Sequence, residues 1–360
     1  MACQFRNLIF EGGGVKGIAY VGALQELQRQ HVLDGITRVG GTSAGAITAV
    51  LVALNYTLAE IEACMTSLDF SRLLDASSGY LRNTARLLRR FGWYKGDYFR
   101  SWIGGQIACK TGDPNMTFSE LYALNTAVPF RELYLIGTNL STGYSEVFSV
   151  ETTPDMPIAD AVRISMSIPF LFAAPSGSNG DIYVDGGLLN NYPIKLFDQK
   201  KYVQHAAHYC HKAYYDHHNA GIPADTNNGD MYIYNKETLG FRLDSAQEIA
   251  VFRDHALPKA HPIRSLFSFS KALMKTLLDS QEHSHLHSDD WDRTIYINTL
   301  GVKTTEFQLS EHKKKQLVQS GKNHTERYFC WFHHAGSRPA NHTRQPPANN
   351  KQEDTNKDSP

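Results

Sequence analysis

One stretch near the amino terminus sets the class of fold: residues 8–27 read LIFEGGGVKGIAYVGALQEL. Leu8–Phe10 is short and apolar and is followed by glycines, which predicts a buried strand. Val15–Gln30 carries apolar residues at helical spacing, so a helix is expected directly after the glycines. A strand, a glycine loop and a helix in this order are typical of an α/β protein whose sheet is mainly parallel.

The glycine run at residues 12–17 is a candidate site for negative charge. Consecutive glycines let backbone N–H groups point into one space, and the start of a helix adds positive potential. The loop could hold a phosphate or a developing oxyanion, or it could be a packing turn. It also fits the GxGxxG pattern of dinucleotide-binding folds. Asp34 lies near the distance at which that fold has its acidic residue, but it precedes the second expected strand, where it could not reach a ribose.

A second motif is Gly41-Thr42-Ser43-Ala44-Gly45, between a strand expected at residues 36–40 and an apolar helix expected at residues 43–54. This is GxSxG in the strand–turn–helix context that a nucleophile elbow requires. A sharp turn there would expose Ser43 at the sheet edge, and the helix start would favour negative charge on its oxygen. The alternative is an ordinary serine that caps a helix.

A third motif is Asp185-Gly186-Gly187, at the end of a strand expected at residues 182–184. In a parallel sheet, ligands gather at the carboxyl ends of the strands, so this carboxylate should lie near Ser43 and the glycine loop. The alternative is a turn, for which Asp-Gly is a common signal.

The rest of the chain continues the alternation of strands and helices. Capping-box patterns predict helix starts at Thr57 and Thr117. From residue 336 onward almost nothing is apolar, so that segment cannot bury enough surface to offset its ordering entropy. We expect a first part that carries all three motifs, a C-terminal part that continues or caps the same fold, and a disordered polar tail, at residues 5–198, 199–335 and 336–360.

Composition narrows the class of protein. The chain has 360 residues, of which 42% are hydrophobic, which is enough for a real core. Its 36 basic and 36 acidic side chains cancel, which argues against a nucleic-acid-binding protein. Five widely spaced cysteines without a CxxC motif argue against a disulfide framework. We expect no cleaved leader, and the longest apolar stretch, at residues 44–54, is shorter than the ~18 residues needed to cross a bilayer.

The three motifs, in this order, resemble those of the patatin-like phospholipase family. That family combines an oxyanion loop GGGx[KR]G, a GxSxG elbow and a DG[AG] motif for the catalytic acid. Ser167-Ile168-Pro169 and the run Gly186–Pro193 look like further segments of the family, and Trp93–Asp97 is similar to a segment of bacterial members. The resemblance is strong over residues 7–196 and thins beyond them.

The resemblance implies a three-layer α/β/α fold with a mainly parallel central sheet. It also implies a serine hydrolase that cleaves acyl esters of membrane lipids, without a metal or other cofactor, with Ser43 as nucleophile and Asp185 as general base. The implied oxyanion hole, elbow and supporting positions are, in that order, Gly12, Gly13, Gly14, Lys16 and Gly17, then Gly41 and Gly45, then Gly186 and Gly187. Lys16 could steady the loop or help to neutralise a lipid phosphate. The implied substrates are phospholipids or lysophospholipids cleaved at the sn-1 or sn-2 ester, and some bacterial members need an activating protein partner.

Three other segments carry weaker signals. Basic residues interleave with apolar ones before the segment at residues 93–97, as in a helix on an anionic membrane surface or in an ordinary surface helix. The candidate membrane contacts are Arg82, Arg86, Arg89, Arg90 and Trp93. Histidines cluster at residues 205–218 without partners at ligand spacing, so we expect a solvated insertion rather than a zinc site. Residues 266–278 form an amphipathic helix expected to serve as core or lid.

Two alternatives to the hydrolase stay open at this point. One is a non-catalytic lipid-binding protein on the same scaffold, and the other is a dinucleotide-binding oxidoreductase. The expected location is the cytoplasm or the periphery of a membrane. Delivery as a bacterial effector without a cleaved signal peptide is a further hypothesis.

Overall fold

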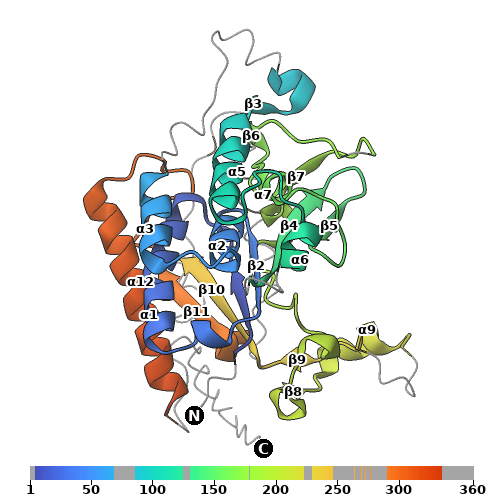
Figure 1. Cartoon of the computed structure of the whole chain (residues 1–360), viewed down its shortest axis with the longest axis vertical. Coiled ribbons are helices and arrows are strands. Elements are labelled where there is room, and N and C mark those ends of the chain that lie inside the picture. Colours follow the sequence, from blue (N-terminus) through green and yellow to red (C-terminus); the bar gives the residue numbers. More distant parts are fainter. Residues whose placement is uncertain are drawn as a thin grey trace, which may run out of the picture.

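Figure 1 shows the computed structural model of the chain. Its described residues are 5–68, 86–124, 130–177, 179–222, 229–245 and 290–334, with the single residues 263, 269, 272 and 276. Arg82, most of the helix expected at residues 266–278 and the tail at residues 336–360 lie outside this set.

The central sheet contains seven of the described strands: β1 (Asn7–Phe10), β2 (Arg38–Thr42), β4 (Glu132–Asn139), β5 (Tyr144–Phe148), β7 (Tyr183–Asp185), β10 (Thr238–Asp244) and β11 (Thr294–Asn298). The longer described helices are α1 (Ala19–Arg29), α2 (Ala44–Ala53), α3 (Leu58–Ser67), α5 (Asp97–Thr111), α6 (Phe118–Leu124), α7 (Ile158–Ser165) and α12 (Glu311–Phe332). The shorter elements are α8 (Gly187–Asn190), α9 (Asp216–Asn219), and the small ribbons β3 (Gly92–Tyr94) with β6 (Phe170–Phe172) and β8 (Tyr209–Cys210) with β9 (Tyr234–Asn235).

The strands run in the order β11-β10-β1-β2-β4-β5, and β7 is also paired with β4. The first five of these run parallel to one another, as the sequence predicts for most of the sheet. β5 and β7 instead run antiparallel to β4. For β5 the reason is the connection: a turn of four residues joins it to β4, and a parallel partner would need a crossover of a dozen residues or more.

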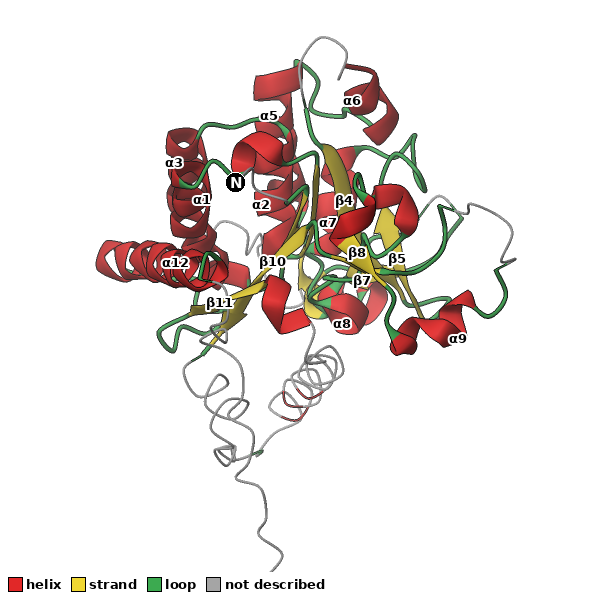
Figure 2. Ribbon diagram, turned by 90° about the horizontal axis from the view of Figure 1, so that it is seen from below, coloured by secondary structure: helices red, strands yellow, loops and turns green. Residues whose placement is uncertain are grey.

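One face of the sheet is covered by helices (Figure 2). Leu8 and Phe10 point into the core that α1, α2, α7 and α12 help to form. Ile9, between them, belongs to a second core on the opposite face, because side chains alternate along a strand. That face is covered by α8 and by the segment that follows it, which contributes Tyr192, Ile194, Phe197 and Tyr202. The fold is therefore the expected α/β/α arrangement.

The C-terminal part completes this sheet. β10 pairs with every residue of β1, and β11 adds the next strand of the sheet. α12 packs on α1. The two helices approach closely at glycines: a Cβ at Gly22 would lie 1.8 Å from the Val318 carbonyl oxygen, and one at Gly321 would lie 1.9 Å from that of Ala19. Residues beyond 198 thus supply both a neighbouring strand for β1 and a helix that packs closely on α1.

The histidine-rich segment lies in an arm that carries β8, α9 and β9, below the sheet in the view of Figure 1. Its base is anchored by buried Arg293, which donates to both carboxylate oxygens of Asp198 at 2.6 and 2.7 Å. His208 lies 2.8 Å from Glu237, and His211 lies 2.6 Å from Asp216. Among the described residues, no group of three or more His, Cys, Asp or Glu side chains is arranged to hold a metal ion.

Candidate active site

The glycine loop leaves the end of β1 and enters a short 3-10 helix at residues 14–18, before α1. Gly14 has φ +55°, and a Cβ there would lie 2.2 Å from the Thr304 carbonyl oxygen, so only glycine fits. The N–H groups of Gly13 and Gly14 donate to no acceptor within the part of the chain that the structure describes. Two adjacent donors at a helix start are suited to bind negative charge.

Three of the residues expected in the oxyanion hole have other contacts. The Gly12 N–H donates to the Asn191 carbonyl at 3.0 Å, so in this structure it already has an acceptor within the chain. Gly17 packs against the first residue of α2, where a Cβ would lie 3.2 Å from that of Ala44. Lys16 donates from Nζ to the Leu243 carbonyl at 3.2 Å, which favours a role in steadying the loop.

Ser43 lies in a strained turn between β2 and α2, with φ 54° and ψ −123°. The turn is tight enough to require glycine on both sides. A Cβ at Gly41 would lie 2.3 Å from the Gly45 carbonyl oxygen, and one at Gly45 would lie 2.3 Å from that of Phe10. Backbone strain of this kind persists only where the surrounding structure enforces it, and it is typical of nucleophile elbows.

Ser43 and Asp185 are in contact, although 142 positions separate them. The Ser43 hydroxyl donates to Oδ2 of Asp185 at 2.8 Å. β4 explains the meeting: β2 pairs with it up to Thr42 opposite Ile136, and antiparallel β7 ends with Asp185 opposite Gly137. The two strands therefore approach head-on along one edge of β4. The sequence predicts the proximity, but as two parallel strands ending side by side, which is not the arrangement found.

The Asp185 carboxylate is buried and lies among few polar groups. Burial raises its pKa to about 7, although hydrogen bonds from the Gly187 N–H and the Ser43 hydroxyl act in the opposite direction. The Gly187 N–H donates to Oδ1 at 2.8 Å and fixes the rotamer. Gly186 lies against β4, where a Cβ would be 2.3 Å from the Ile136 carbonyl oxygen. A carboxylate with this pKa is a competent base at neutral pH.

Two of the residues that support this pair, Ser165 and Met166, are not singled out by the sequence, whereas Ser167 belongs to the Ser-Ile-Pro segment. Ser165, at the end of α7, accepts the Ser43 N–H on its Oγ at 2.9 Å, and the Met166 sulfur lies 3.6 Å from the Ser43 oxygen. Ser167 accepts the Asp185 N–H on its carbonyl oxygen. The Ser-Ile-Pro motif indicates this region of the sequence, but it does not predict which backbone groups these serines contact in the folded chain.

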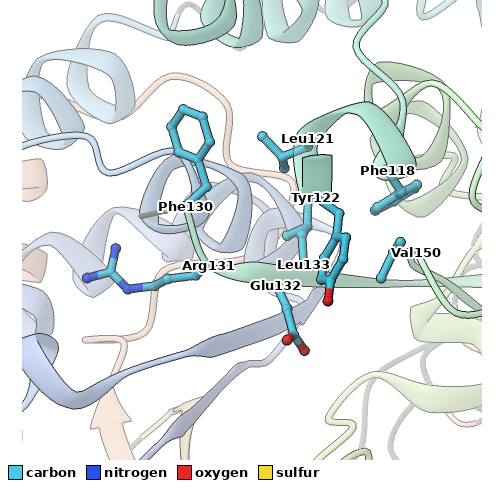
Figure 3. A pocket seen from close by; sticks show the side chains of 8 residues that line it. All are labelled: Phe118, Leu121, Tyr122, Phe130, Arg131, Glu132, Leu133 and Val150. Atoms are coloured by element: carbon cyan, nitrogen blue, oxygen red, sulfur yellow. The ribbon is translucent and has the colours of Figure 1, made fainter. Parts of the chain in front are cut away.

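An apolar pocket lies elsewhere (Figure 3). It is lined by Phe118, Leu121, Tyr122, Phe130, Arg131, Glu132, Leu133 and Val150. Leu133 precedes Gly137 by four strand residues, which places the pocket roughly 13 Å down β4 from the Ser43–Asp185 pair. The pocket contributes no residue to the pair or to the glycine loop.

A strained serine at a strand-to-helix turn, in contact with a buried carboxylate beside a glycine loop, is an arrangement typical of serine hydrolases. The particular family follows from comparison with known proteins. The chain belongs to the patatin-like phospholipase family, whose sequence pattern matches residues 8–198. The match includes all three motifs and ends before β10, β11 and α12.

The chain is similar to proteins from several sources. It is 36% identical to the uncharacterised protein R571 of Acanthamoeba polyphaga mimivirus, over 88% of this chain and 91% of that protein. It is 28% identical to the probable lipid hydrolase 463L of Invertebrate iridescent virus 6, over 53% of this chain and 63% of that protein. VipD of Legionella pneumophila shares the fold, with a TM-score of 0.55, 19% identity and coverage of 91% of this chain and 67% of the other.

Proposed function

We propose that the protein is a serine acyl hydrolase that acts through a Ser43–Asp185 dyad. Ser43 attacks the acyl carbonyl, Asp185 accepts its proton and delivers it to the leaving alcohol, and water then hydrolyses the acyl-enzyme. The N–H groups of Gly13 and Gly14 bind the oxyanion of the tetrahedral intermediate. The observation that carries the proposal is the 2.8 Å hydrogen bond from Ser43 to Asp185, whose pKa is raised to about 7.

The raised pKa answers a difficulty of two-residue dyads. An ordinary aspartate has a pKa of about 3.9 and is a weak base near neutral pH. Burial destabilises the charged carboxylate and makes it a stronger proton acceptor. The proposed acylation uses groups of this chain, and the second step adds one water molecule.

Lipid acyl esters are the substrates we propose. Membership of the patatin-like phospholipase family supports this class, as does the similarity to a probable lipid hydrolase. Within the class we propose phospholipids or lysophospholipids cleaved at the sn-1 or sn-2 ester. None of the described helices combines the length and the apolar character needed to cross a membrane.

The enzyme must then meet a lipid surface, and we propose that the β3–β6 ribbon makes this contact. Arg86 is less suited than expected, because its guanidinium donates to the Trp93 carbonyl at 2.7 Å, and Trp93 itself is half-buried. Arg89 and Arg90 are exposed and directly precede Phe91, which is 53% exposed. Phe170, 52% exposed, is paired across the ribbon with Gly92. Aromatic rings beside arginines are typical of surfaces that bind anionic lipid.

Release of fatty acid from mixed phospholipid vesicles tests the proposal, with EDTA present and with or without eukaryotic cell lysate. We expect the wild type to release fatty acid and Ser43→Ala to release at least ~1,000-fold less while keeping its circular dichroism spectrum. The lysate arm tests whether an activating protein is required. Equal release by Ser43→Ala would contradict the mechanism. No release by the wild type in any arm, together with no labelling of Ser43 by a fluorophosphonate, would favour a lipid-binding scaffold instead.

A further inference from the structure

Side chains at both ends of the glycine loop form hydrogen bonds with the backbone of the same residue, Leu243 of β10. At the start of the loop, Oε2 of Glu11 accepts the Leu243 N–H at 2.6 Å. At its other end, Nζ of Lys16 donates to the Leu243 carbonyl at 3.2 Å. The N–H and the carbonyl of Leu243 are therefore bound by the side chains of Glu11 and Lys16, which lie on either side of Gly12, Gly13 and Gly14 in the sequence.

The side chain of Leu243 also sets the position of the loop. A Cβ at Gly13 would lie 2.5 Å from Cδ1 of Leu243, so the loop backbone rests directly on this side chain. Leu243 is buried and belongs to the main core. It lies beyond residue 198, outside the segment that matches the family. The C-terminal part of the chain thus supplies the support on which the loop rests.

Charge makes the Glu11 contact costly to lose. Glu11 is buried, and its Oε1 lies 3.7 Å from Nε of Arg242. Arg242 is also buried and donates to Asp244 at 3.0 Å. A buried ion network is weak evidence for stability, because desolvation offsets much of the attraction. Its location beside a loop that must hold two backbone donors in place favours a role in fixing the geometry of that loop.

We propose that Glu11 and Lys16 are positioning residues that align the Gly13 and Gly14 N–H groups with the oxyanion by fixing the loop to the backbone of Leu243. This inference rests on the proposed function. Hydrogen-bond donors stabilise a transition state only when they are held at the position where charge develops, so a loosened loop should slow the chemical step more than it weakens substrate binding.

The test compares Glu11→Gln and Lys16→Met with matched controls. Glu26→Gln removes another buried carboxylate, which pairs with Arg29 at the far end of α1. Lys314→Met removes another lysine that donates to a backbone carbonyl, that of Thr66 at 2.8 Å. The assay measures kcat and KM on a soluble short-chain ester, with active sites counted by fluorophosphonate titration, so that misfolded protein does not lower kcat.

We expect kcat to fall about 10-fold or more in both loop variants, with KM within about twofold of the wild type, and Lys16→Arg to recover most of the loss. A kcat equal to that of the matched controls would overturn the inference. If Glu11→Gln fails to fold, the comparison of Lys16→Met with Lys16→Arg and Lys314→Met decides alone. If the wild type shows no turnover that depends on Ser43, the proposed function itself is contradicted. The two failures are therefore distinguishable.

Discussion

At Asp185, burial and hydrogen bonding act on the same carboxylate in opposite directions. Burial raises its pKa to about 7 and outweighs the hydrogen bonds from Gly187 and Ser43. If this carboxylate is the general base, the free enzyme is active only when it is ionised, so kcat/KM should rise with pH through a midpoint near 7. A pH profile on a soluble ester between pH 5 and 9 measures this. A rate that is already independent of pH at pH 5 would mean that the catalytic base has the pKa of an ordinary aspartate and that burial does not raise it.

The same shift predicts how stability depends on pH. The folded-state pKa of about 7 lies above the unfolded value of about 3.9, so between these values the folded state holds a proton that the unfolded state has lost. Stability from this group therefore falls as pH rises from 4 to 7, by no more than about 4 kcal/mol at 1.36 kcal/mol per pKa unit. Asp185→Asn lacks this penalty, so its melting temperature relative to wild type should be higher at pH 8 than at pH 5.

Thermal melts at the two pH values measure this difference. Asp155→Asn, at an exposed carboxylate, is the matched control and should show no comparable change between pH 5 and pH 8. Because the loss of a hydrogen bond affects both pH values equally, the change with pH isolates the charge. The same difference for both variants would contradict a buried, pKa-shifted Asp185.

The β3–β6 ribbon is an element whose geometry the fold alone does not require. Phe91 and Phe170 have positive φ values of 60° and 66°, a region that costs a bulky residue roughly 1–2 kcal/mol, yet both side chains are largely exposed. If they insert into lipid, Phe91→Ala with Phe170→Ala should weaken binding to anionic vesicles at least about fivefold. Turnover of a soluble ester should stay within twofold of the wild type, because neither residue touches the dyad.

Vesicle co-sedimentation measures this binding, and Tyr122→Ala is the matched control. Tyr122 is a similarly exposed aromatic residue on α6, beside the pocket of Figure 3 and away from the ribbon. Arg89→Gln with Arg90→Gln should lower binding at low salt and have a smaller effect at high salt, because screening weakens surface electrostatics. Equal vesicle binding by the phenylalanine variant and the Tyr122 control would contradict the proposal that the ribbon contacts the lipid surface.

For the molecule as a whole, we predict that the segment that matches the family does not fold without the residues that follow it. Without residues beyond 198, β1 would lose its partner β10, and α1 would lose the close packing of α12. A protein of residues 5–198 should therefore fail to melt cooperatively, whereas residues 5–335 should do so and label with a fluorophosphonate. Calorimetry and limited proteolysis of the two proteins measure this. A cooperative melt of residues 5–198 would show that the first part folds alone.

The sequence by itself determines the features that depend on short stretches of backbone. The apolar strand before Glu11, the capping box at Thr57 and the glycines around Ser43 follow from local sterics and hydrogen bonding, and each is found where the pattern predicts it. The resemblance adds the identity of the candidate dyad. The dyad stays a prediction, whereas the local features are confirmed because the information for them lies within a few residues.

Only the tertiary structure determines how distant segments meet. β7 has three residues, and nothing in so short a pattern specifies that it pairs antiparallel with β4 and meets β2 head-on. The hydrogen bond from the Gly12 N–H to Asn191 joins segments about 180 positions apart. The hydrogen bonds of Glu11 and Lys16 with the backbone of Leu243 join segments more than 220 positions apart. The pKa of Asp185 belongs to this group as well, because burial is a property of the packed chain and not of the residue.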